Sequence, residues 1–204
     1  MQWVATFVSY VMNRLFLSPE VSGMQNLLEL VELKMEKKLA VIFISNHINC
    51  NDPFVETAFL PDILKEKIFP IIFLTAHEKF GGFLKSSIMK SLGCIPVANG
   101  KGQNIREVLR RIKDGESAYL FPEAKMSSDG EMDRDQGALQ LFSKFSDVIV
   151  QPIHITGLGY GWDLLKMFLR KRKVHVVFGQ PFVLSKGSTV DAMEIIKERC
   201  VKTH

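Results

Sequence analysis

Leu39-Ala40-Val41-Ile42-Phe43-Ile44 is a run of six apolar residues that leads directly into Ser45-Asn46-His47-Ile48-Asn49-Cys50-Asn51-Asp52. A short apolar run of this kind, closed by polar residues, predicts a strand that is buried on both faces. His47 and Asp52 then follow the carboxyl end of the strand. In parallel sheets, binding and catalytic sites form at this edge.

The rest of the chain alternates between short apolar segments and helical patterns. We expect strands at 39–45, 70–75, 94–97, 118–121, 148–155 and 174–178, and helices at 25–38, 53–60, 80–92, 104–113, 136–145, 162–169 and 190–201. This alternation predicts an α/β domain with a mostly parallel central sheet flanked by helices. Because the chain has no internal repeat or low-complexity linker, we expect one domain over 18–204, preceded by an apolar segment at 1–17.

The segment 1–17 carries a single charge, Arg14, among many apolar residues. As a helix it would be roughly 25 Å long, which is shorter than the hydrocarbon core of a bilayer. It has neither the basic start nor the small-residue cleavage site of a signal peptide. The segment predicts a helix that lies in a membrane interface, although a first helix packed on the domain fits equally well.

The composition is that of a folded globular protein, with 47% hydrophobic and 24% charged residues in a chain of 204. A net charge of +4 is too mild for a nucleic-acid-binding stripe. The basic clusters in 104–113 and 170–173 fit a solvated face, an anionic membrane or an anionic acyl carrier. Cys50, Cys94 and Cys200 lack the spacing of metal ligands, so we expect free thiols in a reducing compartment and no metal.

His47 and Asp52 are the residue types that a general base requires. If the loop curls back, the carboxylate can hold one ring nitrogen while the other takes a proton from a substrate hydroxyl. Histidine suits this role because its ordinary pKa of about 6.5 is close to neutral pH. Two other interpretations stay open. In the first, Asp52 before Pro53 is an ordinary helix start, and His47 is a loop residue without a catalytic role. In the second, Cys50 is a nucleophile, which is disfavoured because nothing nearby marks a thiolate site.

Further polar loops follow other predicted strand ends. Gly93-Cys94-Ile95-Pro96-Val97 leads to Asn99, and Phe121-Pro122-Glu123-Ala124-Lys125 follows the strand at 118–121. A later strand, Val150-Gln151-Pro152-Ile153, contains a proline. Together with the segment from Asn46 to Asp52, these blocks stand in the order and spacing of the glycerolipid acyltransferases of the lysophosphatidate acyltransferase superfamily. The chain resembles this family over roughly residues 21–200.

The resemblance implies transfer of a fatty acyl group from acyl-CoA or acyl-carrier protein to a lipid hydroxyl, with no cofactor or metal. It implies that His47 is the general base and that Asp52 orients it. It also implies that the active site lies at the cytoplasmic face of a membrane and that the protein is peripheral or monotopic. The implied substrate-binding residues are Asn99, Pro122, Glu123, Ala124 and Lys125.

Two blocks depart from the common family pattern. Asn99 stands where many members carry arginine, and Ala124-Lys125-Met126 stands where they carry Gly-Thr-Arg. An amide does not replace a bidentate guanidinium, so an acceptor with a terminal phosphomonoester is disfavoured. The chain is more similar to the acyltransferase half of the bifunctional 2-acylglycerophosphoethanolamine acyltransferase/acyl-carrier-protein synthetase, in which Lys125 would match a third-block arginine.

This similarity favours a lysophospholipid acceptor whose diester head group carries one negative charge. Three alternatives remain: a phosphatidate-forming enzyme, a thioester hydrolase, and a lipid-binding protein without catalytic activity. The acyl-chain length, the donor and the oligomeric state do not follow from the sequence.

Overall fold

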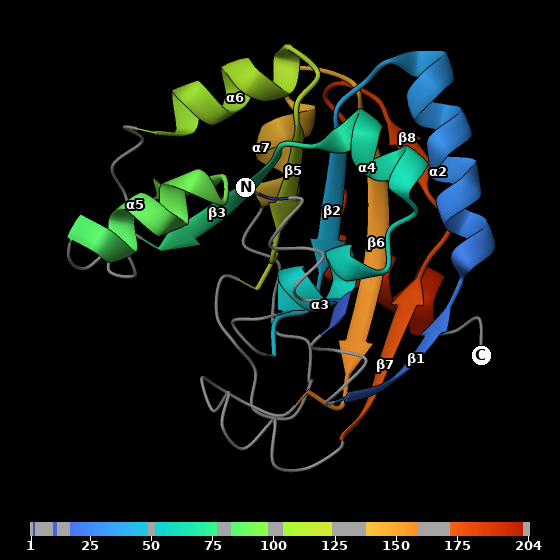
Figure 1. Cartoon of the computed structure of the whole chain (residues 1–204). Coiled ribbons are helices and arrows are strands. Elements are labelled where there is room, and N and C mark those ends of the chain that lie inside the picture. The colour runs from blue at the N-terminus through green and yellow to red at the C-terminus, as the bar shows by residue number, and fades with distance from the viewer. Residues whose placement is uncertain are drawn as a thin grey trace.

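The computed structural model is shown in Figure 1 and describes residues 2, 10, 11, 17–48, 52–76, 83–97, 104–123, 138–158 and 172–201. In this described part, a sheet of eight strands has the order β1-β7-β6-β2-β5-β3-β4, and β8 also pairs with β6. The strands are β1 (Leu17–Ser22), β2 (Val41–Ser45), β3 (Ile71–Ala76), β4 (Cys94–Val97), β5 (Ser117–Leu120), β6 (Val148–Thr156), β7 (Arg172–Phe178) and β8 (Phe182–Leu184).

The sheet is mostly parallel. Strands β6, β2, β5, β3 and β4 run in one direction. Strands β7 and β8 run antiparallel to β6, and β1 pairs in parallel with β7. Five parallel strands alternating with helices confirm the predicted α/β domain.

Helices cover both faces of this sheet (Figure 1). They are α2 (Met24–Lys37), α3 (Asp52–Ala58), α4 (Asp62–Ile68), α5 (Phe83–Ser91), α6 (Ile105–Lys113), α7 (Ala138–Ser143) and α9 (Ala192–Ile196), which continues into a π-helical turn at Lys197–Val201. Residues of α2, α3 and α4 belong to the apolar core on one face. Residues of α6, α7 and α9 belong to the core on the other face.

Strand β2 lies at the centre of the domain and is buried along its whole length. Val41 and Phe43 pack into the core beneath α2 and α4, whereas Ile42 and Ile44 pack into the opposite core. This is the period-two alternation of a strand with apolar layers on both sides. The register pairs Ile44 of β2 with Leu120 of β5, so the loops after these two strands begin side by side.

The structure contains elements that the sequence patterns do not predict. Strand β1 includes Ser18, Pro19 and Glu20, which break the apolar pattern of a strand. It lies at the edge of the sheet, where proline and charged residues are tolerated. Leu17, expected to close the N-terminal segment, is the first residue of β1. Helix α4 and strand β8 are also additional, and the helix expected at 162–169 lies outside the described residues.

The described residues of the N-terminal segment contact the domain. Gln2 Nε2 donates to the carbonyl oxygens of Ile71 (2.6 Å) and Leu92 (2.8 Å), and its Oε1 accepts the Ile71 N–H at 2.8 Å. Tyr10 meets Phe59 edge to face, with ring centroids 6.3 Å apart. Within the described ranges, no helix has both the length and the apolar character needed to cross a bilayer.

Candidate active site

The loop after β2 brings His47 and Asp52 together. His47 Nδ1 lies 3.1 Å from Asp52 Oδ2, and the same oxygen accepts the backbone N–H of Ile48 at 2.7 Å. Asp52 opens α3, so the carboxylate reaches back from the helix to the loop that precedes it. The predicted contact between the imidazole and the carboxylate is therefore present.

The two side chains differ in their access to solvent. Asp52 is fully buried, whereas the His47 side chain keeps 18% of its surface exposed. A buried carboxylate at Nδ1 favours the tautomer that carries its proton there. Nε2, on the far side of the ring from Nδ1, then has a free lone pair with which to accept a proton.

An aromatic side chain fixes the plane of the His47 ring. Phe121, directly after β5, stacks on the imidazole with centroids 3.9 Å apart and an angle of 21° between the planes. Tyr119 of β5 supports Phe121 from the core, at a centroid distance of 5.2 Å. The ring thus contacts a carboxylate at Nδ1 and an aromatic ring on its face.

Glu123 joins the same site from the loop after β5. Its side chain is buried, and Oε1 accepts the backbone N–H of His47 at 3.3 Å. Pro122, beside it in the sequence, is buried as well. The structure therefore places Glu123, one of the expected substrate-binding residues, next to His47, and Pro122 directly precedes it in the chain. The other three, Asn99, Ala124 and Lys125, lie outside the described residues.

Asn46 anchors the loop that carries His47, a role that the sequence patterns do not reveal. Its Nδ2 donates to the carbonyl oxygen of Ile155, and its Oδ1 accepts the N–H of Ile155, both at 2.8 Å. This pair of bonds ties the end of β2 to β6. Because Asn46 is fully buried, a displaced amide would leave several polar groups unpaired.

Glu56 is a second buried carboxyl in α3, one helical turn after Asp52. The Ser45 hydroxyl oxygen lies 2.8 Å from Glu56 Oε1 and 3.1 Å from the carbonyl oxygen of Asn46. Burial raises the pKa of Glu56 well above its ordinary value, and the charge of Asp52 raises it further. The sequence shows that Asp52 and Glu56 are four positions apart, but the burial of Glu56 depends on the fold.

The other histidines and cysteines lie elsewhere. Burial lowers the pKa of His154 in β6, and exposed His175 in β7 pairs with Glu20 at 3.1 Å. Cys94 and Cys200 are buried free thiols, and burial raises the pKa of Cys200 to about 12. Cys50 lies outside the described residues. Among the residues described, no cluster of His, Cys, Asp or Glu could hold a metal ion.

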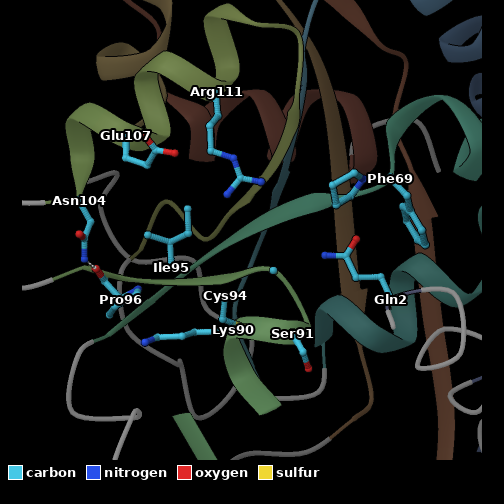
Figure 2. Close-up of a pocket in the computed structure, with 12 residues that line it drawn as sticks. Gln2, Phe69, Lys90, Ser91, Cys94, Ile95, Pro96, Asn104, Glu107 and Arg111 are labelled. Carbon is cyan, nitrogen blue, oxygen red and sulfur yellow. Dashed lines mark hydrogen bonds between the residues drawn. The ribbon is translucent and has the colours of Figure 1, made fainter. Parts of the chain in front are cut away.

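A separate hollow of about 790 Å³ lies at the β4 edge of the sheet (Figure 2). Glu107 and Arg111 of α6 lie on one side of it, and Ile95 and Pro96 of β4 lie below them. Asn104 Nδ2 donates to the Pro96 carbonyl oxygen at 2.6 Å and closes one end. Its lining residues are distinct from those around His47.

Comparison with known proteins identifies a family and a similar solved structure. The sequence model of a protein family described as Acyltransferase matches residues 18–156. The fold is similar to a crystal structure of the 1-acyl-sn-glycerophosphate (LPA) acyltransferase PlsC from Thermotoga maritima. That match has a TM-score of 0.66 and 19% identity, and it covers 96% of this chain and 74% of that chain. No curated protein sequence matches the chain.

Proposed function

The chain belongs to the acyltransferase family, and we propose that it transfers a fatty acyl group from a thioester to the free hydroxyl of a lysophospholipid. The observation that carries the proposal is the 3.1 Å contact between His47 Nδ1 and the buried Asp52 carboxylate. It supports a general base that is oriented and partly open to solvent, as a substrate hydroxyl requires.

The reaction proceeds by direct attack. His47 Nε2 takes the proton of the acceptor hydroxyl as its oxygen forms a bond to the thioester carbonyl carbon. The tetrahedral intermediate then collapses, the carbon–sulfur bond breaks, and the departing thiolate takes the proton from the imidazolium. Asp52 stabilises the imidazolium between these two steps. The products are an ester and a free thiol, with no acyl-enzyme.

The acceptor class follows from residues that resemble the family's phosphate-binding positions. Asn99 stands at the position of an arginine in that family, and Lys125 supplies one positive charge two residues after Glu123 in the sequence. A single lysine matches the single charge of a phosphodiester head group better than the double charge of a phosphomonoester. We therefore place lysophosphatidylethanolamine or lysophosphatidylglycerol ahead of lysophosphatidate.

The donor is an acyl thioester of coenzyme A or of acyl-carrier protein. The protein works at a membrane surface, because both the acceptor and the apolar segment 1–17 favour the interface. The basic residues of α6 and of 170–173 are suited to an anionic surface or carrier.

The test is an acyl-transfer assay with purified protein in detergent. Acyl-CoA and acyl-carrier protein serve as donors. The acceptors are glycerol-3-phosphate, lysophosphatidate, lysophosphatidylethanolamine, lysophosphatidylglycerol and water. We expect a diester lysophospholipid to give the highest rate. Preference for lysophosphatidate would support the phosphatidate-forming alternative, and acid release without acceptor would identify a hydrolase.

One substitution tests the acceptor assignment directly. Asn99→Arg should raise the rate with lysophosphatidate relative to lysophosphatidylethanolamine, because a guanidinium binds a phosphomonoester bidentately. Met35→Arg on the exposed side of α2 adds the same charge and should leave the ratio unchanged. An unchanged ratio in Asn99→Arg would mean that residue 99 does not face the head group.

A further inference from the structure

Two carboxyls are buried one helical turn apart in α3. Asp52 and Glu56 are both fully shielded from solvent, and each would repel the other if both were ionised. Two buried carboxyls at this spacing rarely keep two negative charges, since neither is solvated and their repulsion is poorly screened. Burial and repulsion therefore favour a pair that shares one proton, and the surrounding contacts indicate which member carries it.

The hydrogen bonds favour Asp52 as the anion. Its Oδ2 accepts the Ile48 N–H and contacts His47 Nδ1, and both are donors when the imidazole carries its proton on Nδ1. Among the contacts that the structure describes, Glu56 instead faces one hydroxyl, that of Ser45, at 2.8 Å from its Oε1. A carboxyl that accepts from two N–H donors is stabilised as the anion more than one that faces a single hydroxyl.

The geometry around Ser45 gives a second, independent argument. The Ser45 oxygen lies within hydrogen-bond distance of Glu56 Oε1 and of the Asn46 carbonyl oxygen. A carbonyl oxygen can only accept, and a hydroxyl has a single proton to donate. If Glu56 were ionised, two acceptors would compete for that proton. A neutral Glu56 donates to the Ser45 oxygen, and Ser45 then donates to the Asn46 carbonyl.

This chain of bonds ends on the peptide that carries His47. The Asn46 carbonyl and the His47 N–H belong to the same peptide group, and the N–H donates to Glu123. The peptide is thus held at both of its polar atoms, one by the Glu56–Ser45 pair and one by Glu123. Glu56 affects the base in two ways, through the position of this peptide and through the charge that it leaves on Asp52.

We propose that Glu56 is a positioning residue that stays neutral beneath the site, donates to Ser45, and leaves Asp52 as the anion of the pair. The titratable groups that interact with Glu56 in the described structure are Asp52 on α3 and Cys200 in the C-terminal turn. His47 contacts Asp52, and Glu123 accepts the His47 N–H. The Cys200 thiol is neutral at physiological pH because burial raises its pKa to about 12. The proposal deepens the proposed acyl transfer and rests on it for its kinetic test.

The kinetic test compares Glu56→Leu with Glu56→Gln. Leucine fills the space without a donor, so kcat should fall on the order of tenfold while KM stays within about twofold. The Gln amide can donate to Ser45 as a neutral carboxyl does, so the kcat of Glu56→Gln should be close to that of the wild type. When kcat/KM is plotted against pH, the fall at acid pH should occur at the same pH in Glu56→Gln as in the wild type. Glu66→Gln, exposed on α4, is the charge-matched control.

An ionised Glu56 predicts a different profile. Glu56→Gln would then remove an anion from beside the imidazolium, and the fall at acid pH would move on the order of one unit to lower pH. That shift, or a Glu56→Leu variant with wild-type kcat, would overturn the proposal.

Infrared spectroscopy tests the charge without any assay of activity. At pH 7 the wild type should show a carbonyl band of a protonated carboxyl that is lost in Glu56→Gln and kept in Glu66→Gln. Absence of a difference between wild type and Glu56→Gln in this region would overturn the proposal. If the difference is present but no variant transfers acyl groups, the neutral Glu56 is supported and the proposed reaction fails.

Discussion

His47 and Asp52 share more than a side-chain contact. The Asp52 oxygen that lies 3.1 Å from His47 Nδ1 is the same one that accepts the N–H of Ile48 at 2.7 Å. One buried carboxylate therefore fixes both the imidazole and the backbone that follows it. The position of the base depends on α3, because Asp52 is the first residue of that helix.

Asp52→Asn should preserve the fold and remove most of the activity. The amide oxygen can still accept the Ile48 N–H, but the side chain no longer stabilises an imidazolium. We expect kcat to fall on the order of 10²–10⁴-fold. Steady-state kinetics on Asp52→Asn and on Asp62→Asn, an exposed aspartate of α4, checks this. Equal activity in the two variants would show that Asp52 has no role in the chemistry.

Phe121→Leu should loosen the His47 ring. The stacked pair, with centroids 3.9 Å apart, loses an aromatic contact of about 0.5–1.5 kcal/mol. If this energy holds the ring in place, kcat falls about 2–10-fold. Phe121→Tyr retains the stacking face and should stay close to the wild type. A Leu variant as active as the Tyr variant would refute the positioning role of the ring.

Asn46→Leu should destabilise the protein strongly. It leaves the N–H and the carbonyl of Ile155 unpaired in a buried site, at a cost of about 2–5 kcal/mol. Asn26→Ala is the comparison, because Asn26 makes a bond to Phe178 in a partly buried site and should cost about 1 kcal/mol. Urea denaturation measures both. Similar losses in the free energy of unfolding of the two variants would contradict the anchoring role of Asn46.

The raised pKa of Glu56 predicts a pH dependence of stability. Between the ordinary value of 4.5 and the raised folded value, the folded state binds more protons than the unfolded state. The free energy of unfolding therefore falls as the pH rises through this window, by at most about 1.4 kcal/mol per pH unit. Glu56→Gln lacks the pH dependence that this carboxyl causes. The free energy of unfolding of the variant, relative to that of the wild type, should therefore rise with pH. Denaturation of both proteins from pH 4 to 8 checks this, and parallel curves would contradict it.

Much of the sheet could be predicted because its strands are short, apolar and bounded by polar residues. The run from Leu39 to Ile44 predicts β2, and the rule that loops meet at the carboxyl ends of parallel strands predicts that Glu123 lies near His47. Strand β1 cannot be predicted in this way, because Pro19 and the polar residues around it resemble a loop and only pairing with β7 makes the segment a strand.

The supporting residues of the site could not be predicted in the same way. Asn46 binds a backbone group 109 residues away, so its role depends on the pairing of β2 with β6. Glu56 lies on a helix that was predicted, but no pattern indicated that this side chain is buried against Ser45. Local patterns predict the elements and the strand-end residues, whereas these partners exist only after the sheet is assembled.

The role of His47 as the general base is tested by comparing acyl transfer by the wild type, His47→Ala and His175→Ala. His175 is an exposed histidine of β7 and serves as the matched control. We predict that His47→Ala loses at least about 10³-fold in kcat with its lysophospholipid acceptor, while His175→Ala retains wild-type activity. Acyl transfer by folded His47→Ala at the wild-type rate would contradict the assignment of His47 as the general base.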